Sequence, residues 1–269
     1  MTARPTNPEI DELASTASRA RLHVDLPRIG SIVIGLSAAI FFLGVVRELI
    51  IAHFGTETLI QDLRQIALDT EHSAAAYYSA LLLLACAALL FAISRLTRRD
   101  GGSDVPRWTL LAVIFAAMSV DEAVSFHEVL ITPLRETFGL SGIFYFAWVI
   151  PGTILVTLLG LYYFPFLLRL PRRSASLFVL AGTIYVGGAL AMEMVAGFLA
   201  DAHGSLTASP YLVAAVIEEG MEVAGLTIFF LALSGHLSRD WQTVNLRIEA
   251  GRRSAGAATP QHQFGRASA

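Results

Sequence analysis

The stretch GSIVIGLSAAIFFLGVV, residues 30–46, contains no charged side chain. A helix needs about 20 mostly apolar residues to cross a hydrocarbon core of roughly 30 Å. This stretch and its continuation to Phe54 are long enough, and five later segments have the same apolar character. We therefore predict six membrane-spanning helices, at residues 30–54, 73–96, 107–130, 143–168, 174–200 and 211–237.

The composition of the whole chain agrees with this prediction. Only 15% of the 269 residues are charged and 55% are hydrophobic, whereas soluble domains carry roughly 25% charged residues. Cys86 is the single cysteine, which excludes an intrachain disulfide. No block of basic residues is interleaved with aromatic ones, so we exclude nucleic acid as a partner. The sequence predicts an all-α, polytopic membrane helix bundle whose partner is the lipid bilayer.

The arginines predict the orientation of the bundle. All 19 basic residues are arginine, a usage typical of GC-rich bacterial genes. All of them except Arg47, Arg64 and Arg135 fall in the two tails or in the second and fourth connections, counted with the adjoining helix edges. Because basic residues mark the cytoplasmic side, residues 1–29 and 238–269 are predicted to be cytoplasmic tails flanking a transmembrane domain at 30–237. The polar residues 1–29 do not resemble a cleavable signal peptide, so a multi-pass protein of the bacterial inner (plasma) membrane is expected.

Three local patterns add detail to this arrangement. Residues 55–71 have apolar positions at helical spacing, which predicts either an amphipathic helix on the outer face or a cap over the bundle. Pro151 predicts a kink in the fourth span. Small residues in the fifth span predict close approach of a neighbouring helix, and these are Gly182, Gly187, Gly188 and Gly197.

The third span ends in a run of polar residues. On a continuous helix, Asp121, Ser125 and Glu128 share one stripe, because they are four and three residues apart. Glu122 lies beside this stripe, and His127 is expected to point well away from Asp121. Ionisable groups inside a membrane are costly and usually face the interior of a bundle or a cavity.

Acids on the other spans are predicted to lie at a similar depth. Glu218, Glu219 and Glu222 fit one face of the sixth span, and Glu193 lies in the fifth. Arg47 and Glu48 lie in the first span, where Arg47 is expected either to be the counter-ion of a nearby acid or to extend its charged end outward to the interface. At about 1.5 Å per residue, all these groups fall in one layer in the outer half of the bilayer.

Carboxylates with an imidazole are ligands of iron, manganese or zinc, and carboxylates alone suit calcium, magnesium or manganese. We therefore predict a site for a divalent or iron-type metal ion. Its candidate ligands are Asp121, Glu122, His127, Glu193, Glu218 and Glu222, supported by Arg47, Glu48, Ser119, Ser125, Glu128 and Glu219. The paired Glu-x-x-His motifs of di-iron bundles are missing, so a complete di-iron site would need His53, His72 or His203 from the outer loops.

The chain resembles a group of uncharacterised bacterial multi-pass inner-membrane proteins. The resemblance rests on Ser119-Val120-Asp121-Glu122 with His127-Glu128 in one span and on Glu218-Glu219-Gly220-Met221-Glu222 in another. It covers the last four predicted spans and implies no activity, so no catalytic residue is assigned from it.

Three functions fit these patterns. The first is a metal-binding membrane protein, including a metal-dependent enzyme whose metal activates water or dioxygen on a lipid-like substrate. The second is a proton- or cation-coupled transporter, because stacked carboxylates suit a relay. The third is a structural or assembly subunit of a membrane complex. A homo-oligomer or a larger membrane complex is compatible with the sequence. The chain has no lysine, so it cannot form a retinal Schiff base.

Overall fold

The computed structural model describes residues 26–54, 63–68, 70, 72–206 and 209–240. The predicted tails, 1–29 and 238–269, fall almost entirely outside these ranges. The described residues form helices and turns and contain no strand. In chain order, the elements are α2 (Leu26–Phe54), η1 (Arg64–Ile66), α3 (Ala74–Arg99), α4 (Val105–Val124), η2 (His127–Leu130), α5 (Ile131–Phe138), η3 (Gly142–Phe144), α6 (Val149–Leu167), α7 (Arg172–Val186), η4 (Gly187–Met192), α8 (Glu193–His203) and α9 (Ser209–Asp240).

Several of these helices are long and apolar enough to cross a membrane. Four such segments are Leu26–Ile51, Ala74–Arg99, Val149–Leu167 and Arg172–His203. A fifth arises if α4 and the following helical turns, His127–Phe138, are taken as one bent span. Large apolar side chains such as Leu81 and Leu161 are more than 60% exposed on the outer surface of this part of the chain. An apolar exterior of this kind is the surface expected in contact with lipid. The structure thus shows an all-helical protein with four to five candidate spans.

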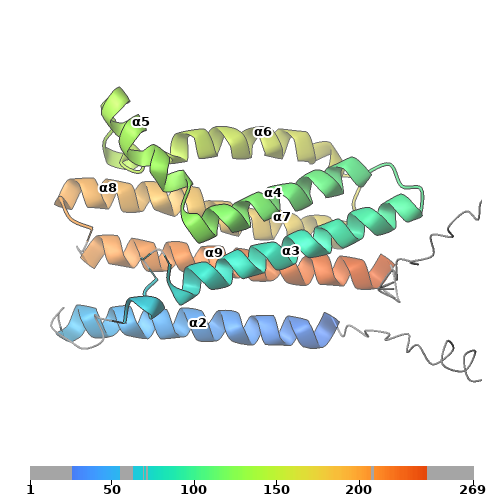
Figure 1. Cartoon of the computed structure of the whole chain (residues 1–269), viewed down its shortest axis with the longest axis horizontal. Helices are drawn as coiled ribbons and strands as arrows, with labels where there is room; N and C mark the ends of the chain where they lie inside the picture. Colours follow the sequence, from blue (N-terminus) through green and yellow to red (C-terminus); the bar gives the residue numbers. More distant parts are fainter. Residues whose placement is uncertain (1–25, 55–62, 69, 71, 207–208, 241–269) are drawn as a thin grey trace, which may run out of the picture. The chain divides into compact units, whose positions relative to one another are not determined.

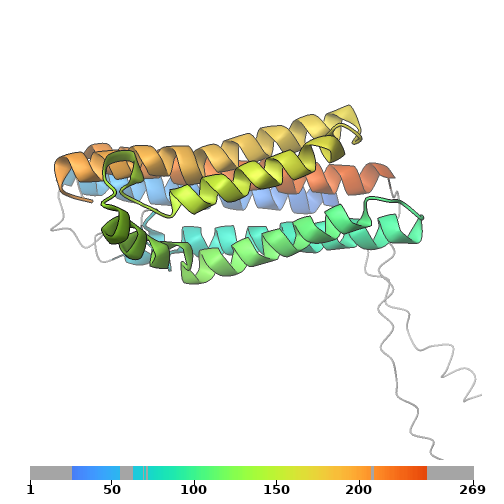
Figure 2. The same cartoon turned by 90° about the horizontal axis from the view of Figure 1, so that it is seen from above.

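Helix α9 is the centre of the helical arrangement. It contacts α2, α3, α7, η4 and α8, while α3 and α4 form the most extensive helix pair. Figure 1 shows the long helices running along one common axis, and Figure 2 shows the same alignment from above. Side chains of α9 are therefore enclosed by helices that are remote in sequence. Polar groups on α9 meet other helices instead of lipid.

Two glycines permit the close approach of α7 and η4 to α9. A Cβ atom on Gly225 of α9 would lie 2.7 Å from the backbone nitrogen of Tyr185 in α7. A Cβ atom on Gly188 of η4 would lie 2.9 Å from the carbonyl oxygen of Glu218. The predicted role of Gly188 agrees with this packing, whereas Gly197 packs against Tyr145 and Phe146 in the bend before α6 and not against a helix. Gly182 has no atom within 4 Å of the corresponding position, so its predicted contact is wrong.

The third and fourth predicted spans differ most from the helices of the structure, while the ends of the other four differ by four residues at most. The third was expected to run to Leu130, but α4 ends at Val124, and the chain bends by 73° before the next helical turns. Ser125 causes this end, because it adopts a left-handed conformation with φ 55° and ψ 44°. The fourth was expected to begin at Ile143 with a kink at Pro151, but α6 begins at Val149. Pro151 lies in its first turn, where proline does not break a helix.

The connection between α2 and α3 favours the predicted cap over the amphipathic helix. Residues 55–62 lie outside the described ranges, and in residues 63–68 the helical part is the single turn η1. Ala67 and Leu68 are almost completely buried. Leu68 packs against Gly44 of α2, and η1 also contacts α3. This segment is packed over the end of the bundle.

The fifth span contains a break in its hydrogen-bonding pattern. Helices α7 and α8 are joined without a turn by η4, which is a π-helix, Gly187–Met192. Such segments are rare and are frequent at functional sites. Glu193 follows directly as the first residue of α8.

Candidate functional site

The centre of the candidate site is a pair of glutamates on two facing helices. Glu193 of α8 and Glu218 of α9 are hydrogen-bonded to each other through their side chains. Glu218 also interacts electrostatically with Glu219 and Glu222 on its own helix. Two carboxyl groups form such a hydrogen bond only when one of them carries a proton, since a carboxylate is an acceptor alone.

Tyr185 of α7 joins this pair to the acids of α4. It interacts electrostatically with Glu222, Glu122, Glu219 and Asp121. Glu219 and Glu222 interact with both Tyr185 and Glu218, so six acids form one connected group, which we call the carboxyl cluster: Asp121, Glu122, Glu193, Glu218, Glu219 and Glu222. It draws on α4, α8 and α9, remote segments that the sequence placed at one depth. No pattern in the sequence had indicated a role for Tyr185.

His127 approaches Asp121 directly, so the expectation that it points away from Asp121 is wrong. Its Nδ1 lies 2.7 Å from Asp121 Oδ2, and its backbone N–H donates to Asp121 Oδ1 at 3.0 Å. The reason is the left-handed Ser125, which ends α4 and turns the chain back over the last helical turn. The predicted stripe of Asp121, Ser125 and Glu128 assumed a continuous helix and does not form.

Trp148, immediately before α6, connects His127 to the glutamate pair. Its ring lies 4.7 Å from the His127 ring, measured between centroids, and its Nε1 donates to Glu193 Oε1 at 2.9 Å. No pattern in the sequence had indicated a role for Trp148. Since Trp148 precedes the helix, no helical periodicity linked it to the acids.

Several predicted supporting residues lie elsewhere. Arg47 and Glu48 form a buried ion pair on α2, which agrees with the expected role of Arg47 as a counter-ion. Ser119 donates to the carbonyl oxygen of Ala80 at 2.7 Å and ties α4 to α3. Ser125 is buried at the turn after α4, and Glu128 is exposed. These contacts fix helix positions around the carboxyl cluster.

The described residues do not contain a preformed metal centre. Among them, no group of three His, Cys, Asp or Glu side chains has an arrangement that could hold a metal ion. Of the outer-loop histidines, His203 binds the carbonyl oxygen of Leu199 on its own helix. His53 contacts the ring of Phe54, and His72 contacts that of Tyr77. The metal site stays a prediction.

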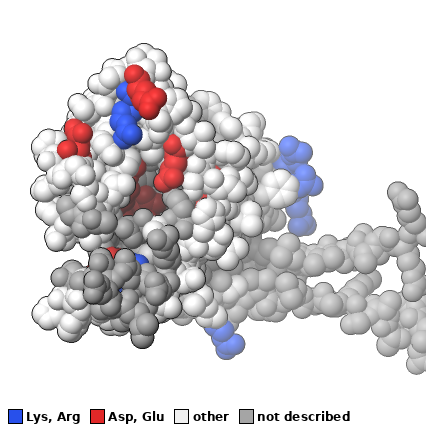
Figure 3. Space-filling view, turned by 60° about the vertical axis from the view of Figure 1, so that its left-hand side comes forward, with Lys and Arg blue, Asp and Glu red and all other residues white. Residues whose placement is uncertain are grey.

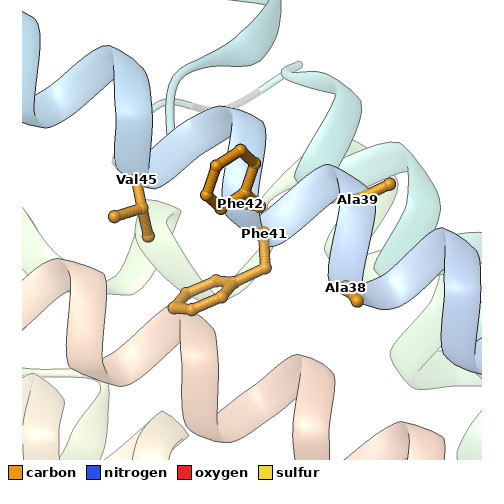
Figure 4. A pocket seen from close by; sticks show the side chains of 5 residues that line it. All are labelled: Ala38, Ala39, Phe41, Phe42 and Val45. Carbon is orange, nitrogen blue, oxygen red and sulfur yellow. The ribbon is translucent and has the colours of Figure 1, made fainter.

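The end of the molecule that carries the carboxyl cluster is hollowed. Figure 3 shows acidic side chains at the bottom of this hollow and on its rim. A separate, purely apolar groove lies on α2, lined by Ala38, Ala39, Phe41, Phe42 and Val45. In Figure 4, Phe41 and Phe42 of this groove point in different directions from α2. The Phe41 ring covers Gly220 of α9, next to Glu219, where a Cβ atom would lie 2.8 Å from the ring.

Aromatic side chains separate the carboxyl cluster from the opposite end of the bundle. Phe229 of α9 is buried, stacks on Phe115 of α4 at 4.8 Å and contacts Phe178 of α7 at 5.2 Å. About two turns further along α9, His236 is 4% exposed and stacks on Trp108 at 5.4 Å. An aromatic layer thus lies between the carboxyl cluster and His236.

His236 is a buried histidine that the sequence patterns did not single out. Its Nδ1 lies 3.2 Å from the Ser174 hydroxyl of α7. Helical spacing could have indicated its buried position. His236 follows Glu222 by about four turns and therefore lies on the same face of α9.

The fold and this site define the class of the protein: its described part is all-helical, with several helices long and apolar enough to span a membrane and with carboxyl groups gathered between helices. Residues 28–237 match the family described as "Domain of unknown function (DUF8692)". The chain belongs to this family, whose match covers nearly all of the helical region. Comparison with curated proteins and with solved structures gave no match.

Proposed function

We propose that the chain is a six-span protein of a bacterial inner membrane with both termini in the cytoplasm. Helix α9 supports a sixth span, because its 32 residues run beside the candidate spans along the same axis. The arginine-rich connections lie at the end of the bundle away from the carboxyl cluster, which supports a cytoplasmic location of that end. The carboxyl cluster then faces the periplasm.

Within this arrangement we propose proton-coupled transport, with the carboxyl cluster as the proton-binding site. The observation that supports it is the hydrogen bond between Glu193 and Glu218. This bond needs one proton, and its loss would leave two negative charges facing each other between α8 and α9. Protonation of the pair therefore changes the energy of the α8 and α9 contact, which is the coupling that a proton-driven membrane protein requires.

Access to the carboxyl cluster from one side also fits a transporter. The hollow opens at one end of the molecule, and the aromatic rings of Phe115, Phe178 and Phe229 lie between the carboxyl cluster and the other end. A transporter alternates the side from which its site is reached. The glycine contacts between η4 and α9 are the place where small helix movements would change this access.

Proton flux into liposomes that contain the purified protein tests the proposal. An imposed pH gradient, read with an enclosed pH-sensitive dye, should dissipate faster with the wild type than in empty liposomes. Glu218→Gln should reduce this flux at least tenfold, because an amide keeps the hydrogen bond but carries no exchangeable acid proton. Glu136→Gln, on the exposed surface of α5, is the matched control and should leave the flux unchanged. Equal flux in wild type and Glu218→Gln would contradict the proposal, and a fall in stability alone would favour a structural subunit.

A metal-dependent enzyme acting on a lipid-like substrate is the second candidate, and the pairing of His127 with Asp121 favours it. Histidines that bind metals usually donate their other ring nitrogen to a carboxylate. Since Nδ1 of His127 contacts Asp121, its Nε2 is the atom available to a metal. Elemental analysis after purification should then find stoichiometric iron, manganese or zinc, lost in His127→Ala and kept in His203→Ala. A metal-free wild type would exclude this candidate.

A further inference from the structure

The helix pair α6 and α7 encloses an apolar groove on the outer surface of the bundle, far from the acids described above. Its volume is about 490 Å³. The lining residues of α6 are Phe164, Leu167 and Leu168, and those of α7 are Ala175, Ser176, Val179, Leu180 and Thr183. Several of these side chains are largely exposed, with Phe164 at 61% and Leu168 at 72%.

Arginines lie at one end of this groove. Arg172 begins α7, and Ser176, Val179 and Thr183 follow it by four, seven and eleven residues. At helical periodicity these positions share one face, so Arg172 stands at the end of the α7 wall of the groove. Arg173 is its neighbour on the exposed first turn.

The charges of Arg172 and Arg173 are available to a ligand. Within the described residues, neither side chain forms an ion pair. The nearby Arg169, by contrast, binds Asp104 at 2.7 Å, and Asp104 also accepts from Arg107 at 2.7 Å. Asp104 is thus neutralised by its own partners and does not compete for Arg172.

We propose that this groove binds an anionic phospholipid, with its phosphate on Arg172 and Arg173 and an acyl chain along α6 and α7. Charge complementarity supports the headgroup position, because basic pockets between membrane helices bind anionic headgroups. The dimensions support the acyl chain. From Arg172 to Thr183 the α7 wall is about 16 Å long, close to one leaflet of a hydrocarbon core of roughly 30 Å. A free phosphate would use the arginines and leave the groove unfilled.

Lipid binding to the full-length, delipidated protein in detergent tests this proposal. The probes are phosphatidylglycerol and phosphatidylcholine with identical acyl chains, with glycerol phosphate as the headgroup alone, and bound lipid is counted by native mass spectrometry. Phosphatidylglycerol should bind more tightly than phosphatidylcholine. Arg172→Gln with Arg173→Gln should weaken its binding roughly thirtyfold, since each basic residue near a membrane surface contributes about fivefold.

Two further variants keep the test decisive. Val179→Trp fills the groove at a lipid-facing position and should weaken phosphatidylglycerol binding while leaving both arginines in place. Arg98→Gln with Arg99→Gln removes two exposed arginines of α3 outside the groove and should leave binding unchanged. The proposal is overturned if both lipids bind equally, if the α3 variant weakens binding as much as the α7 variant, or if glycerol phosphate binds as well as the lipid.

Discussion

The two halves of α9 pack against the continuous helical segment formed by α7, η4 and α8, but they bury different kinds of side chain. The first half presents Glu218, Glu222 and Gly225 to Glu193, Gly188 and Tyr185. The second half presents Phe229 and His236 to Phe178 and Ser174. In the second half, the buried histidine His236 is stacked on an indole ring and shares the Ser174 hydroxyl with Arg239, which donates to that hydroxyl at 2.8 Å. In the first half, acids face acids, so a bound proton decides whether the contact attracts or repels. Both halves of α9 therefore bury polar groups. Only in the first half does the energy of the helix contact depend on a bound proton.

The largest effect on stability is expected where the two halves join, at Gly225. Gly225→Ala places a Cβ atom 2.7 Å from the Tyr185 backbone nitrogen, so α7 and α9 must separate. We expect a loss of about 1–3 kcal/mol in the free energy of unfolding, as for other overpacked contacts. Thermal unfolding in detergent measures it. Gly182→Ala is the matched control, because that position is open and alanine favours a helix by up to about 1 kcal/mol. Equal behaviour of the two variants would show that the close contact is unimportant.

A smaller effect is expected at Trp148, on the acidic half. Trp148→Phe keeps an aromatic ring beside His127 and removes the N–H that donates to Glu193 at 2.9 Å. The loss of one such bond should cost about 1 kcal/mol of stability. Proton flux should fall less than in Glu218→Gln, because the glutamate pair itself is kept. If both stability and flux were unchanged, a role of Trp148 in the carboxyl cluster would be excluded.

The smallest effect is expected at His236, on the aromatic half. His236→Phe retains the stack on Trp108 and loses the contact between Nδ1 and the Ser174 hydroxyl. Stability should change by no more than about 1 kcal/mol, and proton flux should equal that of the wild type. Loss of flux in this variant would contradict the separation of the two halves and extend the proton path through the aromatic layer.

The helical architecture and the gathering of acids could be predicted from the sequence because both follow from simple periodicities. Apolar segments longer than about 20 residues mark membrane helices, and a rise of about 1.5 Å per residue places Glu193 and Glu218 at one depth. The close approach of another helix at Gly188 could also be predicted, because glycine has no side chain to keep a neighbouring helix away.

The positions of His127 and Trp148 could not be predicted in this way. Serine seldom adopts a left-handed conformation, so nothing in the residues around Ser125 indicates that α4 ends there. A prediction that continues α4 as a regular helix past Ser125 therefore points His127 away from Asp121. Trp148 reaches Glu193 from outside any helix, by tertiary packing alone. Both residues contact the carboxyl cluster only because the chain departs from regular structure.

The π-helix between Gly187 and Met192 determines the direction of Glu193. A π-helical turn accommodates about one more residue than an α-helical turn. Everything after Met192 is consequently rotated by about 100° relative to an uninterrupted α-helix. Removing one residue from this segment would restore the regular register and turn Glu193 away from Glu218. The wider turn thus rotates the direction of the Glu193 side chain toward Glu218, while the axis of the helix that carries it stays in place.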